Sequence, residues 1–132
     1  MLIEPPSLLI TDDDAAFRET LDSVLRPQGF RTLLAGDGEE AIRIVRSQEV
    51  HVVVLDMYMP RLTGLETLRR LKQLRAMLPC ILLSGRLDDL LVEQARLAEA
   101  FSVLPKPVTR RQITGVVRRA LERTYDWPGG PA

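Results

Sequence analysis

Four carboxylates could together bind a cation, because they gather at the carboxyl ends of two apolar runs. Asp12, Asp13 and Asp14 come directly after one run, and Asp56 comes directly after a later one. Carboxylates held about 4 Å apart repel each other by roughly 4 kcal/mol at an effective dielectric constant of about 20, so such a cluster usually requires a cation. The available ligands are oxygens, without nearby sulfur or imidazole, which favours a hard divalent ion such as Mg²⁺.

Two further polar side chains follow apolar runs in the same way. Ser84 closes one run and Lys106 follows the last. A cation beside a lysine and a hydroxyl suits a phosphoryl group, whose oxygens need charge neutralisation and hydrogen-bond donors. The close glycines, Gly36 and Gly38, lack both the Lys-Ser/Thr ending of a nucleotide loop and the dinucleotide spacing, so the phosphoryl donor is a small molecule or another protein. Asp56 is then the natural acceptor, becoming an acyl phosphate.

The elements that position these side chains are predicted from the hydrophobic pattern. Short runs rich in branched aliphatic residues indicate five strands, and apolar residues at helical spacing indicate five helices between them. The predicted strands are residues 8–11, 31–34, 52–55, 80–83 and 102–104, and the helical stripes span residues 17–25, 41–45, 65–71, 90–98 and 113–121, the fourth built from Leu90, Leu91, Ala95 and Ala98.

Regular alternation of strand and helix favours an α/β fold with a doubly wound, five-stranded parallel sheet, because parallel strands need crossovers. In the strand order 2-1-3-4-5, strands one and three are neighbours, and ligands bind outside their carboxyl ends. The acids that follow these two strands should therefore meet in space. Helix starts are predicted by three capping pairs, Asp37 with Glu40, Thr63 with Glu66, and Thr109 with Gln112.

Composition bounds the class of protein. With 132 residues, 45% of them hydrophobic, the chain can bury one core but is too short for two ordinary domains. Lys plus Arg and Asp plus Glu balance at 18 each, so overall charge predicts neither nucleic-acid nor membrane binding. The single cysteine, Cys80, excludes an internal disulfide and should be a buried small hydrophobe. No stretch approaches membrane-spanning length, and no basic segment precedes a long apolar one, so we expect a cytoplasmic protein.

Four motifs together resemble the receiver domain of bacterial two-component response regulators. They are LLITDDD at residues 8–14, VLDMYMP at 54–60 with TGLE at 63–66, LLSG at 82–85 and LPKP at 104–107. The resemblance implies a flavodoxin-like (βα)5 fold over residues 7–123. Residues 1–6 would be an N-terminal tail, and residues 124–132 would be a C-terminal tail or the start of a linker, without room for a DNA-binding domain.

The resemblance also implies a role for each site residue. Asp56 would accept phosphate from a histidine kinase or phosphotransfer protein. Mg²⁺ would be bound by Asp12, Asp13, Asp56 and the backbone carbonyl of Tyr58, with Asp12 acting largely through water. Ser84 and Lys106 would bind the phosphoryl oxygens, and the bond from Lys106 to Pro107 would be cis, a geometry that is plausible only before proline.

Further implications concern turnover and output. The side chains of Tyr58 and Arg86 would flank the water that hydrolyses the acyl phosphate, and their size should slow it. Phosphorylation would change the surface around the fourth and fifth helices, which would control an unidentified output partner or domain or support a weak homodimer. The domain would be a signalling module rather than an enzyme, catalysing only its own phosphorylation and slow dephosphorylation.

Three positions depart from the family pattern. Val103 replaces the aromatic residue whose rotation usually reports phosphorylation, which puts that readout in doubt. Glu99 stands where glycine is common, which puts the turn before the fifth strand in doubt. Ser84 replaces the more frequent threonine but keeps the hydroxyl. Asp14 falls where the first helix begins and is interpreted as a helix cap rather than a metal ligand.

Other interpretations remain open at this stage. A degenerate receiver that serves as a constitutive docking module is disfavoured because every site residue is present. A phosphohydrolase with an aspartyl nucleophile is disfavoured because Tyr58, not an acid, stands two residues after Asp56. The only histidine, His51, lies at the opposite end of its strand and should be structural or at the surface. The arginines of the last helix should form a solvated basic face, with an acidic partner as the alternative; they are Arg110, Arg111, Arg118, Arg119 and Arg123.

Overall fold

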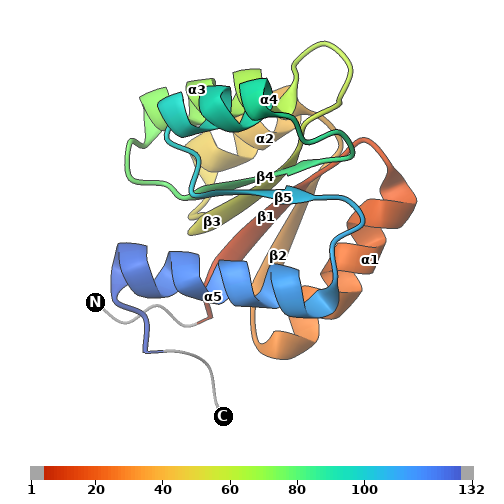
Figure 1. Ribbon diagram of the computed structural model, residues 1–132. Helices are drawn as coiled ribbons and strands as arrows, with labels where there is room; N and C mark the ends of the chain where they lie inside the picture. The colour runs from red at the N-terminus through yellow and green to blue at the C-terminus, as the bar shows by residue number, and fades with distance from the viewer. Residues whose placement is uncertain (1–4, 129–132) are drawn as a thin grey trace.

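The computed structural model describes residues 5–128, which form a five-stranded parallel sheet between two layers of helices (Figure 1). The strand order is β2-β1-β3-β4-β5, so the predicted topology is confirmed. The strands are β1 (Ser7–Thr11), β2 (Arg31–Ala35), β3 (Val52–Asp56), β4 (Cys80–Ser84) and β5 (Ser102–Pro105); the helices are α1 (Ala15–Leu25), α2 (Gly38–Ser47), α3 (Gly64–Leu74), α4 (Asp89–Leu97) and α5 (Arg110–Tyr125), with a short 3-10 helix η1 (Arg26–Gln28) after α1.

Apolar side chains on both faces of the sheet hold the layers together. Along β1, Leu8 and Ile10 pack beneath α1 and α5, whereas Leu9 packs beneath α2, α3 and α4. The strands β1, β3 and β4 are buried along their whole length, as expected for parallel strands covered on both sides. Cys80 is fully buried, as predicted, and burial raises the pKa of its thiol to about 12.

The strands β3 and β4 each end one residue later than the hydrophobic pattern predicts. Asp56 is the last residue of β3 and Ser84 the last residue of β4, so both belong to the sheet rather than to the loops that follow. Asp56 pairs with Leu83, the neighbour of Ser84. Strand backbone is more rigid than loop backbone, so these two side chains have fixed positions at the edge of the sheet.

Two of the three predicted capping boxes are confirmed. Thr63 and Thr109 each cap a helix reciprocally with the residue three positions later. The third pair is correct only in part. Asp37 accepts a hydrogen bond from the Glu40 amide at 2.8 Å, but the Glu40 carboxylate accepts from the Gly36 amide, at 2.6 Å. Asp37 is fully extended, with φ −159° compared with −68° at Thr63, which brings a different amide within reach.

The predicted apolar stripe of α4 was wrong at one residue. Leu91 and Ala95 are buried and Ala98 is half-buried, but Leu90 is 67% exposed. Leu90 and Leu91 are neighbours on a helix and therefore point in directions about 100° apart, so both cannot face the sheet. Leu90 instead lies on the outer side of the helix.

The last helix packs beyond the predicted domain boundary at residue 123. α5 continues to Tyr125, whose hydroxyl donates to the His51 carbonyl oxygen at 2.7 Å. Trp127 is buried, with its ring centroid 5.8 Å from that of Phe30. The basic face of α5 is exposed as predicted except at Arg118, which is half-buried against these two rings. Within residues 5–128, no helix is long and apolar enough to cross a membrane.

Candidate functional site

The three carboxylates predicted as metal ligands meet at the carboxyl edge of the sheet. Asp12, Asp13 and Asp56 each offer a carboxylate oxygen, and these oxygens lie within 4.8 Å of one another. The sheet produces this convergence, because β1 and β3 are adjacent and Thr11 pairs with Leu55 directly before the acids. Asp12 and Asp56 are buried, while Asp13 is exposed. The donor set consists of hard oxygens with one side open to solvent, which fits Mg²⁺.

Lys106 joins two of these acids from the loop after β5. Its ammonium nitrogen lies 2.9 Å from Asp56 Oδ1 and 3.0 Å from Asp12 Oδ2. Burial is the largest influence and acts to lower the pKa of Lys106, but the hydrogen bonds and charges of Asp56 and Asp12 together outweigh it and raise the pKa above its usual value. The backbone also anchors the lysine, because the Lys106 amide donates to the Ser84 carbonyl oxygen at 2.9 Å.

The carboxyl group of Asp56 has a raised pKa. Burial is the largest cause, and the nearby charges of Asp12 and Asp13 act in the same direction. The hydrogen bond and charge of Lys106 oppose the shift but do not cancel it. The carboxylate of Asp56 is partly desolvated and lies near two other negative charges. Its ionised form is therefore stabilised by a ligand or reaction partner that brings positive charge.

Asp14 lies outside the cluster and caps α1, as predicted. Its Oδ1 accepts hydrogen bonds from the amides of Ala16, at 3.0 Å, and Phe17, at 3.3 Å. Its own amide donates to Asp12 Oδ1 at 2.9 Å, so both oxygens of Asp12 are engaged, one by this amide and one by Lys106. Asp12 is therefore fixed in place.

Two contacts at the site could not be predicted from the sequence. The ring of Phe17 lies beneath the Lys106 ammonium group, 4.1 Å from nitrogen to ring centroid. Arg18 donates from Nη1 to the Asp12 carbonyl oxygen at 2.6 Å. Phe17 fits the apolar stripe of α1, so the pattern assigns it to the core. Only its position four residues after Asp13, on the first turn of a helix that starts at the sheet edge, signals a site role.

The hydroxyl of Ser84 is already hydrogen-bonded. It donates to the Arg86 carbonyl oxygen at 2.9 Å and accepts from the Arg86 amide at 3.1 Å. The side chains of Arg86 and Tyr58 are exposed on the loops that follow β4 and β3, and that of Tyr58 is 54% exposed. The structure thus places Ser84 at the cluster's edge of the sheet and leaves the two bulky side chains at its rim.

Gly64 sets how closely α3 approaches β3, the strand that ends in Asp56. A Cβ at this position would collide with the Asp56 carbonyl oxygen and lie 2.8 Å from Leu82 Cδ1. The Gly64 amide also donates to the Met57 carbonyl oxygen at 2.8 Å. The loop between β3 and α3 is therefore closed tightly behind Asp56, and a larger residue would displace the site.

The remaining predicted residues lie on β5 or in the segments that flank it. Val103 is half-buried and packs against the cluster beneath α2, α3 and α4. The peptide bond between Lys106 and Pro107 is cis. Glu99 adopts φ 64°, the left-handed conformation that glycine favours, so the turn before β5 forms despite the substitution.

Comparison with known proteins decides the family. A family model described as the response regulator receiver domain matches residues 8–118. The chain belongs to this receiver family. The receiver domain is a signalling domain. Receiver domains bind Mg²⁺ at an acidic pocket, and this chain has a cluster of three carboxylates, Asp12, Asp13 and Asp56.

The receiver domain is similar to bacterial response regulators. It is 40% identical over 121 residues to the response regulator MprA of Mycolicibacterium vanbaalenii, covering 91% of this chain and 52% of the relative. It is 36% identical over 118 residues to the transcriptional regulatory protein AfsQ1 of Streptomyces coelicolor, covering 89% of this chain and 52% of the relative. The chain therefore spans about half the length of the curated relatives it matches.

Solved structures agree with the fold. The signal receiver domain of an HD domain-containing protein from Pseudomonas fluorescens superposes with a TM-score of 0.87 at 27% identity, covering 92% of this chain and 98% of that one. The receiver fold therefore extends over nearly all of this chain.

Proposed function

We propose that this receiver domain is a phosphorylation-dependent switch in which Asp56 takes a phosphoryl group from the phosphohistidine of a sensor kinase or phosphotransfer protein. The observation that carries the proposal is the contact of Lys106 with Asp56, beside Asp12 and Asp13 at the edge of the sheet. A buried carboxylate with an adjacent ammonium group and two further acids is the arrangement that phosphoryl transfer to an aspartate requires.

The chemistry follows from the positions of these groups. A carboxylate oxygen of Asp56 attacks phosphorus, the phosphorus–nitrogen bond breaks, and the donor's imidazole leaves. Lys106, held 2.9 Å from that carboxylate, is in position to neutralise charge on a phosphoryl oxygen. Asp12, Asp13 and Asp56, with the Tyr58 carbonyl, would hold Mg²⁺, which supplies further neutralisation of the phosphoryl oxygens.

Ser84 connects the chemistry to the rest of the molecule. To donate to a phosphoryl oxygen, its hydroxyl must release the Arg86 carbonyl oxygen, to which it donates at 2.9 Å. That exchange frees the loop between β4 and α4, which carries Arg86 and leads directly into α4. The signal would then pass through backbone of the loop, and Val103 would only have to adjust its packing rather than swing a ring.

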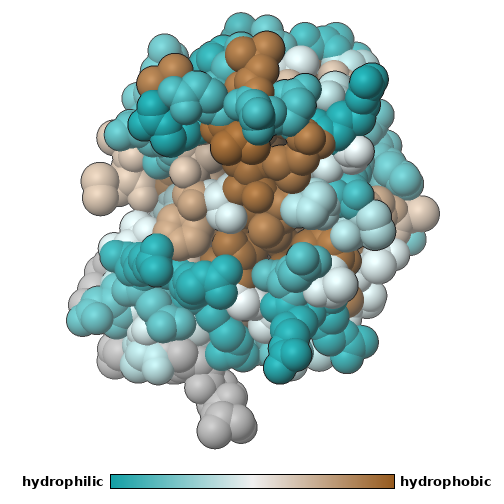
Figure 2. All heavy atoms as spheres, in the orientation of Figure 1, coloured by the Kyte–Doolittle hydropathy of each residue, from teal (hydrophilic) through white to brown (hydrophobic). Residues whose placement is uncertain are grey.

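The output surface would lie on α4, β5 and α5. Figure 2 shows a continuous apolar area on this face, running from α4 across β5 toward α5. On α4, the side chains of Leu90 and Leu97 are each 67% exposed. Large apolar side chains grouped at the surface in this way are typical of a protein–protein contact site. This surface suits an output partner or domain, or a weak homodimer. We place the switch in the cytoplasm, with partners that are proteins rather than nucleic acid.

Phosphorylation by acetyl phosphate in the presence of Mg²⁺ tests the proposal. The parent chain should acquire one base-labile phosphate, and Asp56→Asn should acquire none, because an amide is a far poorer nucleophile. Asp89→Asn, which changes an exposed acid on α4, is the matched control and should be labelled like the parent. Stoichiometric base-labile phosphate on Asp56→Asn would contradict the assignment.

A further inference from the structure

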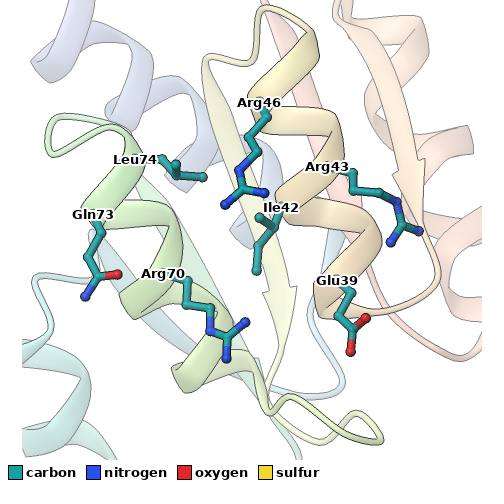
Figure 3. Close-up of a pocket in the computed structure, with 7 residues that line it drawn as sticks. All are labelled: Glu39, Ile42, Arg43, Arg46, Arg70, Gln73 and Leu74. Carbon is teal, nitrogen blue, oxygen red and sulfur yellow. The ribbon is translucent and has the colours of Figure 1, made fainter.

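A groove runs between α2 and α3 on the face of the sheet that carries these helices, and it encloses about 350 Å³ (Figure 3). Its apolar lining comes from Ile42 and Leu74, the latter 41% exposed. Three arginines and one acid border it: Arg43 and Arg46 from α2, Arg70 from α3, and Glu39, whose carboxylate lies 3.9 Å from Arg61. None of these side chains belongs to the phosphorylation site described above.

Among the residues that the structure describes, the arginines bordering the groove form no ion pair. Within residues 5–128, no carboxylate oxygen lies within 4.0 Å of Arg43, Arg46 or Arg70, whereas Arg26 and Arg96 form such pairs on other helices. Figure 3 shows the guanidinium groups of Arg46 and Arg70 directed into the space between the helices, while Arg43 points away from α3. Two like charges facing a groove create a positive potential inside it.

Both ends of the groove are held by specific contacts. At one end the helices touch closely, because a Cβ on Gly38 would collide with the Thr67 hydroxyl. At the other end, Arg75 donates to the carbonyl oxygens of Val45, at 2.8 Å, and Gln48, at 3.1 Å, which fixes the end of α2. The groove is therefore preformed, and a ligand would bind without first ordering it.

We propose that this groove binds a short acidic segment of a partner protein, with acidic side chains on Arg46 and Arg70 and an apolar side chain on Leu74. The ligand must carry both acidic groups for the arginines and an apolar group for Leu74, and this combination decides its class. A free phosphate would use the arginines but gain nothing from Leu74, and a nucleic-acid backbone would need a longer basic track than Arg46 and Arg70 provide. An amphipathic helix uses both features, because residues four apart lie on one face.

The probe for this proposal is a fluorescein-labelled 14-residue peptide with Glu and Leu at helical spacing, titrated against the full chain. The double variant Arg46→Glu with Arg70→Glu should weaken binding by about tenfold or more, because it reverses both charges that meet the ligand. Leu74→Gln should weaken it by about threefold to tenfold through lost apolar contact. Reversing two exposed arginines of α5, Arg111→Glu with Arg119→Glu, is the matched control and should change binding by less than about twofold.

Each other outcome overturns the proposal. It fails if the parent does not bind the peptide, or if the α5 control loses as much affinity as the groove variant. It also fails if a scrambled peptide or a single-stranded oligonucleotide binds equally well, since either result identifies a general polyanion surface. Labelling by acetyl phosphate should be unchanged in all variants, which verifies folding separately from groove binding.

Discussion

The ammonium nitrogen of Lys106 lies 4.1 Å from the centroid of the Phe17 ring while it also contacts Asp12 and Asp56. The carboxylates take up its charge on one side, and the ring covers another side. A cation over an aromatic face is stabilised by roughly 0.5–1 kcal/mol when partly exposed. Phe17 therefore restricts the position of the lysine that the phosphoryl group would meet.

Replacing this ring should slow phosphorylation. Phe17→Leu keeps the apolar bulk but removes the π face, so the rate of labelling by acetyl phosphate should fall by about twofold to fivefold, the equivalent of roughly 0.5–1 kcal/mol. Phe17→Tyr retains the face and should react like the parent. If Phe17→Leu is labelled at the parent rate, the ring only fills space.

Neighbouring acids at residues 13 and 14 should have separable effects. Asp13→Ala removes an oxygen of the carboxylate cluster and should weaken Mg²⁺ binding by about tenfold or more in isothermal titration. Asp14→Ala removes the acceptor for the Ala16 and Phe17 amides and should lower the free energy of unfolding by about 1 kcal/mol, with Mg²⁺ affinity nearly unchanged. Equal loss of Mg²⁺ affinity in both variants would contradict these separate roles.

The sequence predicts the fold well because the strand and helix signals and the positions of the acids all indicate the same sheet. Alternating strand and helix signals require a parallel sheet, and acids directly after two strands must meet once those strands are neighbours. The pattern fails where an apolar side chain has two plausible positions. Leu90 and Phe17 both fit a buried stripe, yet Leu90 is exposed and Phe17 contacts a charge. Hydrophobic period alone cannot separate a core position from an interface or site position.

Contacts that depend on the tertiary fold also cannot be predicted from the hydrophobic pattern. Ser84 is visible in the sequence, but its hydrogen bonds to the Arg86 backbone depend on how the loop folds back. The packing of Trp127 against Phe30 joins residues 97 positions apart, and no local signal near the end of the chain indicates it. Such contacts arise from tertiary structure, so only the folded chain reveals them.

Glu99 should be a site of removable strain. Its φ of 64° ends α4, where the Ala100 amide donates to the Ala95 carbonyl oxygen at 2.9 Å. A residue with a side chain is strained there, so Glu99→Gly should raise the free energy of unfolding by about 1 kcal/mol after the entropy of the unfolded chain is counted. Ala98→Gly, at φ −82°, should instead lower it by about 1 kcal/mol. Denaturant unfolding of both variants checks the opposite signs.

His51 should make stability depend on pH. Its Nδ1 accepts a hydrogen bond from the Ser7 amide at 2.9 Å, so this nitrogen carries no proton in the folded chain. Burial lowers the pKa of His51 below its ordinary value of 6.5, with Arg31 and Arg75 acting in the same direction against Glu49. A lowered pKa in the folded state means that the stabilisation is complete above about pH 6.5 and is lost as the pH falls below it.

His51→Gln separates this effect from other titrations, since a glutamine oxygen can still accept from Ser7 but does not titrate. Between about pH 7 and pH 5, the free energy of unfolding should fall more for the parent than for His51→Gln. Parallel curves for the two proteins would show that His51 is protonated equally easily in the folded and unfolded chains.

Tyr58 and Arg86 should set the lifetime of the phosphorylated state, a prediction that rests on Asp56 as the acceptor. Both side chains stand exposed at the rim of the site, on the loops after β3 and β4. Hydrolysis requires a water in line with phosphorus, and two large side chains at the rim leave less room for that approach. Arg86 can also pair with a phosphoryl oxygen and hold it against attack.

The double variant Tyr58→Ala with Arg86→Ala should therefore lose phosphate about tenfold faster than the parent, the equivalent of about 1.4 kcal/mol of barrier. First-order loss of phosphate from the isolated domain in Mg²⁺ measures this rate. Tyr58→Phe keeps the bulk and should decay like the parent, which separates shielding from any role of the hydroxyl. A double variant that decays as slowly as the parent would mean that both side chains stay in solvent, and that the sheet edge itself controls access of water to the acyl phosphate.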